Sequence, residues 1–213
     1  MAQITTGIRS VLSSARVYNL WTKLIGGAAS CTDLVQNYVR PKAGDKVLDI
    51  GCGTGVLAPF LGKVTYVGFD ANPDYIRKAV QHAQEHNLAN ARFECALVGE
   101  DTLTAEPEFD VVLASGILHH LDDDDAAELL CSAKRALRPG GRFVSCDPGI
   151  VAGQSPLARW LISKDRGQNV RSARDYAELA SAVFPTTVAT HVRHDMLRIP
   201  YTHVILECVN AQS

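Results

Sequence analysis

Cysteine patterns typical of metal sites and disulfide frameworks are missing from this sequence. Its 213 residues include six cysteines, none in a CxxC pair and none grouped with histidines at zinc-site spacing. Several stand in apolar segments, where a free cysteine behaves as a small hydrophobe. We therefore expect no metal site and a protein of the reducing cytosol.

Long apolar runs are also missing. A membrane-spanning helix needs about 20 apolar residues in succession, and no segment approaches that length. Arg9, Arg16 and Lys23 interrupt the region in which a secretory signal would need its apolar core. The sequence therefore predicts a cytoplasmic protein with no membrane partner.

Charge of one sign is not in excess. The 21 basic and 23 acidic residues give a formal net charge of −2, which argues against bulk attraction to nucleic acid. Hydrophobic residues make up 46% of the chain and charged residues 21%, as in ordinary globular proteins. A chain of this length forms one domain with a substantial core and room for a small cap.

The middle of the chain alternates between apolar runs and helical patterns. Apolar strands separated by helices predict a parallel sheet that is covered on both faces. Strands are expected at residues 46–50, 65–69, 92–96, 109–114 and 142–146, and helices at residues 55–61, 73–87 and 124–137.

The two ends of the chain complete the expected fold. Residues 1–40 are expected to form an N-terminal helical lid, and residues 41–213 the main domain, with an insertion at about 149–175. Strands are also expected at 187–196 and 201–208, joined by a link too short for a crossover helix, so they must be antiparallel. The predicted class is α/β: a doubly wound seven-stranded sheet, mostly parallel, with an antiparallel last strand.

A glycine-rich loop follows the first expected strand. Residues 48–55 read LDIGCGTG, and Asp70 ends the second strand 21 residues after Asp49. Glycines let the backbone turn sharply and approach a ligand closely, at the carboxyl edge where open α/β sheets bind ligands. An acidic side chain at position 70 can accept hydrogen bonds from both hydroxyls of a ribose.

Two classes of cofactor share this geometry, and charge separates them. The dinucleotide fingerprint requires a third small residue where this chain has Val56, and Gly55 is one position off. Asp49 would also repel the pyrophosphate of a dinucleotide. S-adenosylmethionine (SAM) instead carries an ammonium and a sulfonium, so a carboxylate there favours SAM over NAD.

Four motifs in order resemble those of class I SAM-dependent methyltransferases of the small-molecule branch. The loop at 48–55 resembles their first motif, and residues 68–72 (GFDAN) resemble the second. Residues 114–121 (ASGILHHL) are similar to the strand-4 motif, and residues 137–141 (LRPGG) resemble the turn before strand 5. This resemblance implies a Rossmann-like fold, SAM as cofactor and S-adenosylhomocysteine (SAH) as product.

The resemblance also implies residue roles in cofactor binding. Asp49, Gly51 and Gly53 are expected to hold the methionine end of SAM, and Asp70 the ribose hydroxyls. The other expected contacts follow the same motifs, with Ala71 and Asn72 along the adenosine; they are Cys52, Gly55, Ala71, Asn72, Ala114, Ser115 and, from the N-terminal helices, Tyr18.

The adenine site departs from the family pattern. Many relatives carry an acidic residue after strand 3 that binds the adenine amine, whereas Leu97 stands at the matching position here. Adenine is therefore expected to meet backbone groups and apolar surface around Ala96 and Leu97.

His119 is the candidate catalytic residue. It follows strand 4 with His120, at the edge where the methyl group should point, and imidazole titrates near neutral pH. Three interpretations stay open: a general base, a contact of the cofactor or cleft wall, or neither. Methyl transfer needs a base only if the acceptor must lose a proton. The expected acceptor is an oxygen or nitrogen of a small molecule, and the oligomeric state is left open.

Two charged segments have ordinary structural interpretations. The acids at 122–125 precede a helix and are expected to cap it rather than bind a metal. The basic residues between 159 and 174 either form a solvated surface or hold an acidic group of the acceptor. They are Arg159, Lys164, Arg166, Arg171 and Arg174.

Two other functions are compatible with the same loop. The chain could bind SAM for another chemistry or as a regulator, or it could be an NAD-linked oxidoreductase, which Asp49 disfavours. A nucleic-acid substrate is not expected, because the strand-4 signature of base amino-methyltransferases is replaced by the residues at 115–118.

Overall fold

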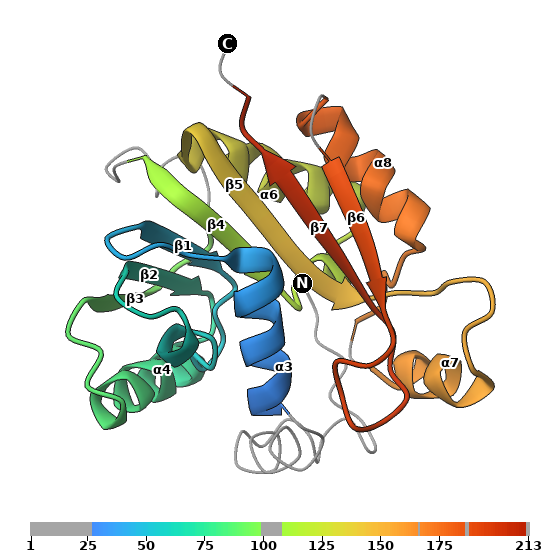
Figure 1. Cartoon of the computed structure of the whole chain (residues 1–213), viewed down its shortest axis with the longest axis horizontal. Helices are drawn as coiled ribbons and strands as arrows, with labels where there is room; N and C mark the ends of the chain where they lie inside the picture. Colours follow the sequence, from blue (N-terminus) through green and yellow to red (C-terminus); the bar gives the residue numbers. More distant parts are fainter. Residues whose placement is uncertain (1–26, 99–107, 166, 186–187, 212–213) are drawn as a thin grey trace.

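A seven-stranded sheet forms the centre of the molecule (Figure 1). The structure is a computed structural model that describes residues 27–98, 108–165, 167–185 and 188–211. The strands lie in the order β3-β2-β1-β4-β5-β7-β6. They are β1 (Lys46–Ile50), β2 (Thr65–Asp70), β3 (Ala91–Cys95), β4 (Phe109–Ser115), β5 (Leu137–Pro148), β6 (Val188–Arg193) and β7 (His203–Val209).

The direction of the strands matches the prediction. Strands β1 to β5 pair in parallel, while β7 runs antiparallel to both β5 and β6. The link between β6 and β7, residues 194–202, is too short for a crossover helix, so the two strands can pair only antiparallel. The expected fold class is confirmed.

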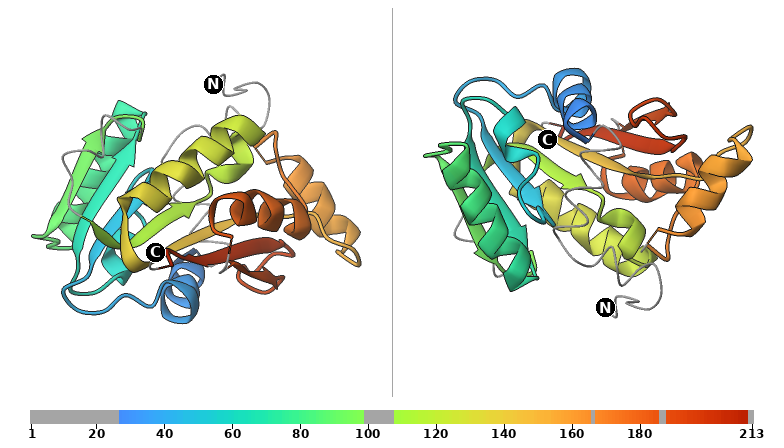
Figure 2. Two further views of the ribbon diagram at one scale, coloured as in Figure 1. Left: turned by 90° about the horizontal axis from the view of Figure 1, so that it is seen from above. Right: turned by 90° about the horizontal axis from the view of Figure 1, so that it is seen from below.

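Helices cover both faces of the sheet (Figure 2). On one face lie α6 (Asp123–Ala136) and α8 (Ala173–Val183); on the other lie α3 (Gly27–Leu34), a π-helical turn (Val35–Val39) and α4 (Pro73–Glu85). The short α7 (Pro156–Ser163) belongs to the insertion after β5. Alternate residues of β4 enter the two cores, Val112 on the α6 side and Val111 on the α3 side. Such two-sided burial explains the continuous apolar runs.

The expected helix at 55–61 is wrong. A 3₁₀ turn, Ala58–Phe60, takes its place. Gly55 has a positive φ of 71° and Gly62 one of 76°, and Pro59 between them donates no backbone hydrogen bond. These residues prevent a regular helix on both sides of the turn, so the segment after the glycine-rich loop stays irregular at the carboxyl edge of the sheet.

The fifth strand is longer than expected. It includes residues 137–141, which were expected to form only a turn. The pairing of β4 with β5 shifts register between Phe109 and Val111, so the turn forms a bulge within the strand.

Residues 34–39 of the expected N-terminal lid pack on the sheet. Leu34, Val35, Tyr38 and Val39 are buried in the core on the α3 side. Residues 1–26, Tyr18 among them, lie outside the described residues, so the lid stays a prediction. No helix within the described ranges is both long and apolar enough to cross a membrane.

Candidate active site

The glycine-rich loop has the backbone that its sequence requires. Gly51, Gly53 and Gly55 have φ values of 74°, 55° and 71°, in the left-handed region that glycine tolerates best. The N–H groups of Gly51 and Cys52 both donate to the carbonyl of Phe69, at 2.8 and 2.9 Å. These bonds fix the loop to the end of β2. The space beside Gly53 is open, because a Cβ built on this residue would have no heavy atom within 4 Å.

Asp49 is buried at the end of β1. Its carboxylate is 2% exposed and accepts a hydrogen bond from the Tyr66 hydroxyl at 2.7 Å. Burial raises the pKa of Asp49 from 3.8 to about 6; the Tyr66 hydrogen bond opposes this shift and repulsion by Asp70 adds to it. A buried carboxylate with a raised pKa gains most from a nearby cation.

Asp70 is prepared to accept hydrogen bonds. One oxygen accepts from the Gly53 N–H at 3.0 Å and the other from the Asn72 N–H at 2.8 Å. Each carboxylate oxygen has two lone pairs, so both can accept a further bond from a hydroxyl. The Asn72 side chain caps α4 by accepting from the Asp74 N–H at 2.9 Å.

The region expected to bind adenine offers apolar surface. Leu97 is 67% exposed and Ala96 is half-buried, just after β3. Ser115 is half-buried at the carboxyl end of β4, whereas Ala114 is fully buried in the core. The side chain of Ala114 therefore packs within the sheet, and only its backbone lies near the site.

These residues fit the charge and polarity of SAM. The negative charge of the Asp49 carboxylate suits an ammonium group, the oxygens of Asp70 can accept from hydroxyls, and Leu97 exposes apolar surface. Because burial raises the pKa of Asp49, a cation beside this carboxylate would stabilise its ionised form.

His119 is held by a carboxylate that the sequence analysis did not single out. Its Nδ1 lies 2.8 Å from Asp147 Oδ1, and its backbone N–H donates to the same oxygen at 3.2 Å. His119 is 4% exposed and Asp147 1%. Asp147 is on β5, next to the strand that precedes His119, so both reach the same edge of the sheet.

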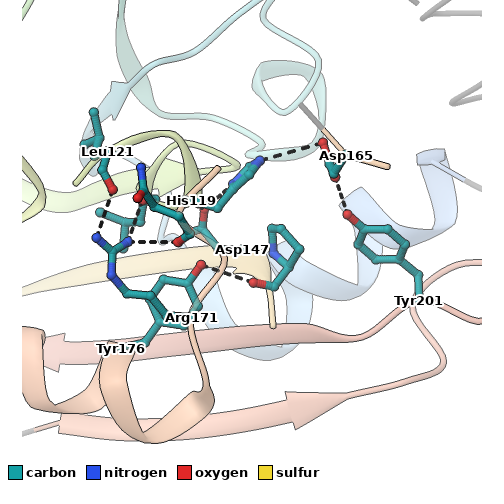
Figure 3. Close-up of polar contacts among 10 residues, drawn as sticks. His119, Leu121, Asp147, Asp165, Arg171, Tyr176 and Tyr201 are labelled. Atoms are coloured by element: carbon teal, nitrogen blue, oxygen red, sulfur yellow. Dashed lines mark hydrogen bonds and ion pairs between the residues drawn. The ribbon is translucent and has the colours of Figure 1, made fainter. Parts of the chain in front are cut away.

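A second carboxylate faces the other ring nitrogen (Figure 3). His119 Nε2 lies 4.0 Å from Asp165 Oδ1, and the Tyr201 hydroxyl donates to Asp165 Oδ2. Gly167 packs so closely on the imidazole that a Cβ there would overlap the ring. The insertion therefore covers the histidine and shields it from bulk water.

Arg171 is structural, contrary to both interpretations of the basic segment. It is 8% exposed, and its guanidinium donates to the carbonyls of Leu118 and Leu121 at 2.9 and 2.8 Å (Figure 3). It also pairs with Asp123 at 2.7 Å. Arg171 thus fastens the end of the insertion to the turn that carries His119.

Among the acids at 122–125, Asp122 has the expected capping role. Asp122 accepts from the Asp125 N–H at 3.0 Å, at the first turn of α6. Within the described ranges, no three His, Cys, Asp or Glu side chains are grouped to hold a metal ion.

Sequence reasoning missed Asp147, Asp165 and Tyr66. A signal existed for Asp147, because it ends a strand as Asp49 and Asp70 do. Asp165 and Tyr66 gave no such signal. Asp165 lies in the insertion after β5, and Tyr66 lies within β2 rather than at its end.

Comparison with known proteins identifies the family. The methyltransferase domain family matches residues 41–196. Over 133 residues the chain is 36% identical to a ubiquinone biosynthesis O-methyltransferase of Mesorhizobium japonicum, and the match covers 57% of this chain and 51% of that protein. The chain spans about half the length of the curated relatives it matches.

Solved structures share the fold at low sequence identity. The SAM-dependent methyltransferase SibL in its apo form gives a TM-score of 0.70 at 18% identity, over 97% of this chain and 60% of SibL. The cyclase SpnF gives 0.68 at 17% identity, over 87% of this chain and 82% of SpnF. The family match, the fold and the loop agree: the chain belongs to the class I SAM-dependent methyltransferases, and SAM is its cofactor.

Proposed function

We propose that this protein methylates a hydroxyl oxygen of a small-molecule acceptor, with His119 as the general base. The observation that carries the proposal is the contact of His119 with Asp147 at 2.8 Å. Residues 49–55 and 70–72 are proposed to hold the cofactor beside it, together with residues 96–97.

The contact with Asp147 fixes the proton on the ring. An ionised carboxylate only accepts hydrogen bonds, so Nδ1 of His119 is the donor. In the neutral imidazole, Nε2 then carries the free lone pair. This nitrogen faces Asp165 rather than the core, which is the orientation a base needs.

His119 and Asp147 have different roles in the proton transfer. Bound SAM supplies a methyl group on a positively charged sulfur, and its transfer forms a C–O bond, breaks a C–S bond and releases SAH. His119 takes the hydroxyl proton at Nε2, and Asp147 stabilises the resulting imidazolium through Nδ1. The buried setting strengthens this ion pair, because little water competes for either group.

A base of this kind favours oxygen over nitrogen as the acceptor. A hydroxyl must lose its proton during the transfer, whereas a neutral amine attacks through its lone pair first. The curated relative from Mesorhizobium japonicum is named an O-methyltransferase, which supports the same choice.

The test separates the base from cofactor binding. We expect His119→Ala to lower the rate of label transfer from SAM to an alcohol and phenol panel by about 100-fold or more. Asp147→Asn should lower the rate in the same direction, because Asn can donate to Nδ1 and disturb the proton position. SAH affinity, measured by calorimetry, should stay unchanged in both.

His86→Ala is the matched control, since His86 is exposed on the far end of α4. It should transfer label at the wild-type rate. Turnover of His119→Ala at the wild-type rate would rule out His119 as the general base.

The second candidate is a SAM-binding protein that transfers no methyl group. It is supported by the cyclase SpnF, which has the same fold and is named for a different reaction. SAH binding without label transfer to any acceptor would support it.

A further inference from the structure

Buried polar atoms without a partner gather at one end of the insertion. In the described part of the chain, four buried side-chain atoms make no hydrogen bond: Asp147 Oδ2, Gln154 Oε1, His203 Nδ1 and His191 Nε2. His191 Nε2 nevertheless faces Glu207 at 2.9 Å. The other three belong to the end of β5, the loop after it and the start of β7.

Backbone contacts bring these three residues together. His203 pairs with Pro148 in the sheet, next to Asp147. The Gln154 amide donates to the Gly149 carbonyl at 3.0 Å, and the Gly149 N–H donates to Thr202 at 3.1 Å. The three residues therefore belong to one short stretch of chain and its sheet partner, and this stretch begins at Asp147, which contacts the proposed base.

A cavity of about 180 Å³ borders this stretch. Most of its wall is polar or small: Gln154, Ser155, His194, Tyr201 and Thr202 contribute to it, together with Ala158. Tyr201 connects the cavity to the base, because its hydroxyl donates to Asp165, which faces His119 Nε2 at 4.0 Å (Figure 3).

The unpaired atoms indicate what kind of ligand fits. Gln154 Oε1, on the wall of the cavity, is an acceptor, and a buried acceptor is costly without a donor. Burial lowers the pKa of His203 to about 4, so this ring adds no positive charge at neutral pH. Ser155 accepts from the Ala158 N–H and keeps its own proton to donate. A hydroxyl both donates and accepts, whereas an ammonium only donates.

We propose that the acceptor is a polyhydroxylated molecule, such as a sugar or another cyclic polyol. This inference rests on the proposed function and names its substrate class. The methylated hydroxyl lies at His119 Nε2, an adjacent hydroxyl donates to Asp165, and the remaining hydroxyls extend past Tyr201 to Gln154.

The experiment measures label transfer from SAM by the full chain to matched acceptors. Myo-inositol and vicinal cyclohexanediol carry adjacent hydroxyls, cyclohexanol lacks the second one, aminocyclohexanol replaces it with an ammonium, and hexylphenol is apolar. We expect kcat/KM to fall about tenfold or more from the diol to cyclohexanol, because cyclohexanol has no second hydroxyl to donate to the Asp165 carboxylate.

Variants locate the cavity contact. Gln154→Leu should lower kcat/KM about tenfold for myo-inositol but leave the smaller diol unaffected, since the diol does not reach Gln154. Gln81→Leu is the control, because Gln81 is exposed on α4 and its side-chain amide donates to Glu85 on the same helix. SAH affinity should be the same in all three proteins.

The outcomes separate the two proposals. Transfer to hexylphenol with all polyols inert would keep the proposed function and overturn the polyol assignment. Preference for aminocyclohexanol, or an unchanged Gln154→Leu variant, would also overturn the assignment. Transfer to no acceptor, with SAH bound, would overturn both.

Discussion

Asp49→Asn is expected to stabilise the free protein while destroying its cofactor site. The folded protein holds the pKa of Asp49 at about 6, compared with its ordinary value of 3.8. Asp49 is almost fully buried, so this difference of about two pH units corresponds to about 3 kcal/mol of folding stability. The side chains of Asp and Asn have nearly the same size, and an Asn carbonyl can still accept from Tyr66.

The sign follows from the direction of the pKa change. Because the folded state raises this pKa, the ionised carboxylate destabilises the fold, fully so above about pH 7. The penalty disappears as the pH falls through about 6 and is absent below 3.8. Asn carries no charge at any of these values, so its advantage exists at pH 8 and vanishes near pH 4.

Thermal unfolding without cofactor provides the assay. At pH 8 we expect the unfolding midpoint of Asp49→Asn to lie above that of the wild type by about 6–12 °C, taking about 2–4 °C for each kcal/mol in a domain of this size. At pH 4 the two midpoints should coincide. An equal or lower midpoint of the variant at pH 8 would refute the reasoning about burial.

Addition of SAH should reverse the order of the two proteins. The wild type gains its ligand's binding energy, whereas the variant lacks the charge that meets the ammonium. At pH 5 only about a tenth of Asp49 is ionised, so the SAH dissociation constant of the wild type should be about tenfold higher than at pH 8. A dissociation constant that does not change with pH would contradict the role of Asp49.

Two further predictions concern the insertion. Gly167→Ala places a methyl group against the His119 ring and should lower turnover at least tenfold with normal SAH affinity; wild-type turnover would show that the ring and loop can separate freely. Arg171→Met removes the guanidinium donor of the buried Leu121 carbonyl and one of the two donors of the Leu118 carbonyl, and it should cost about 2–4 kcal/mol in urea unfolding. Arg174→Met, which removes only a surface pair with Glu178, should leave the unfolding midpoint unchanged, and an equal loss in both variants would contradict the structural role of Arg171.

The alternation of the sheet could be read from the sequence because it depends on local signals. Each of these signals is carried by residues that are close together in the sequence. They are the apolar runs of strands buried on both faces, the cap at Asp122 and the short link before β7. The helix expected at 55–61 failed for a local reason too. Apolar residues recur there, but Pro59 between two glycines outweighs that periodicity.

The partners of His119 could not be read from local patterns. Asp147 is 28 residues away, and Asp165 and Tyr201 come from two other segments. Arg171 seemed to belong to a basic surface, yet its fold context buries it against the turn at Leu118 and Leu121. Charge in a sequence does not reveal burial, because burial depends on which distant segment covers the residue.

Three acids that end parallel strands show how one sheet edge serves two tasks. Asp70, Asp49 and Asp147 end β2, β1 and β5, and β4 lies between the last two. Tyr66 holds Asp49 in a buried setting suited to a cation, while two N–H groups hold Asp70 for hydroxyls. Asp147 instead orients a histidine that follows β4. If the proposed roles hold, the methyl group passes over the end of β4, because this strand alone separates the cofactor acids from the acid behind the base.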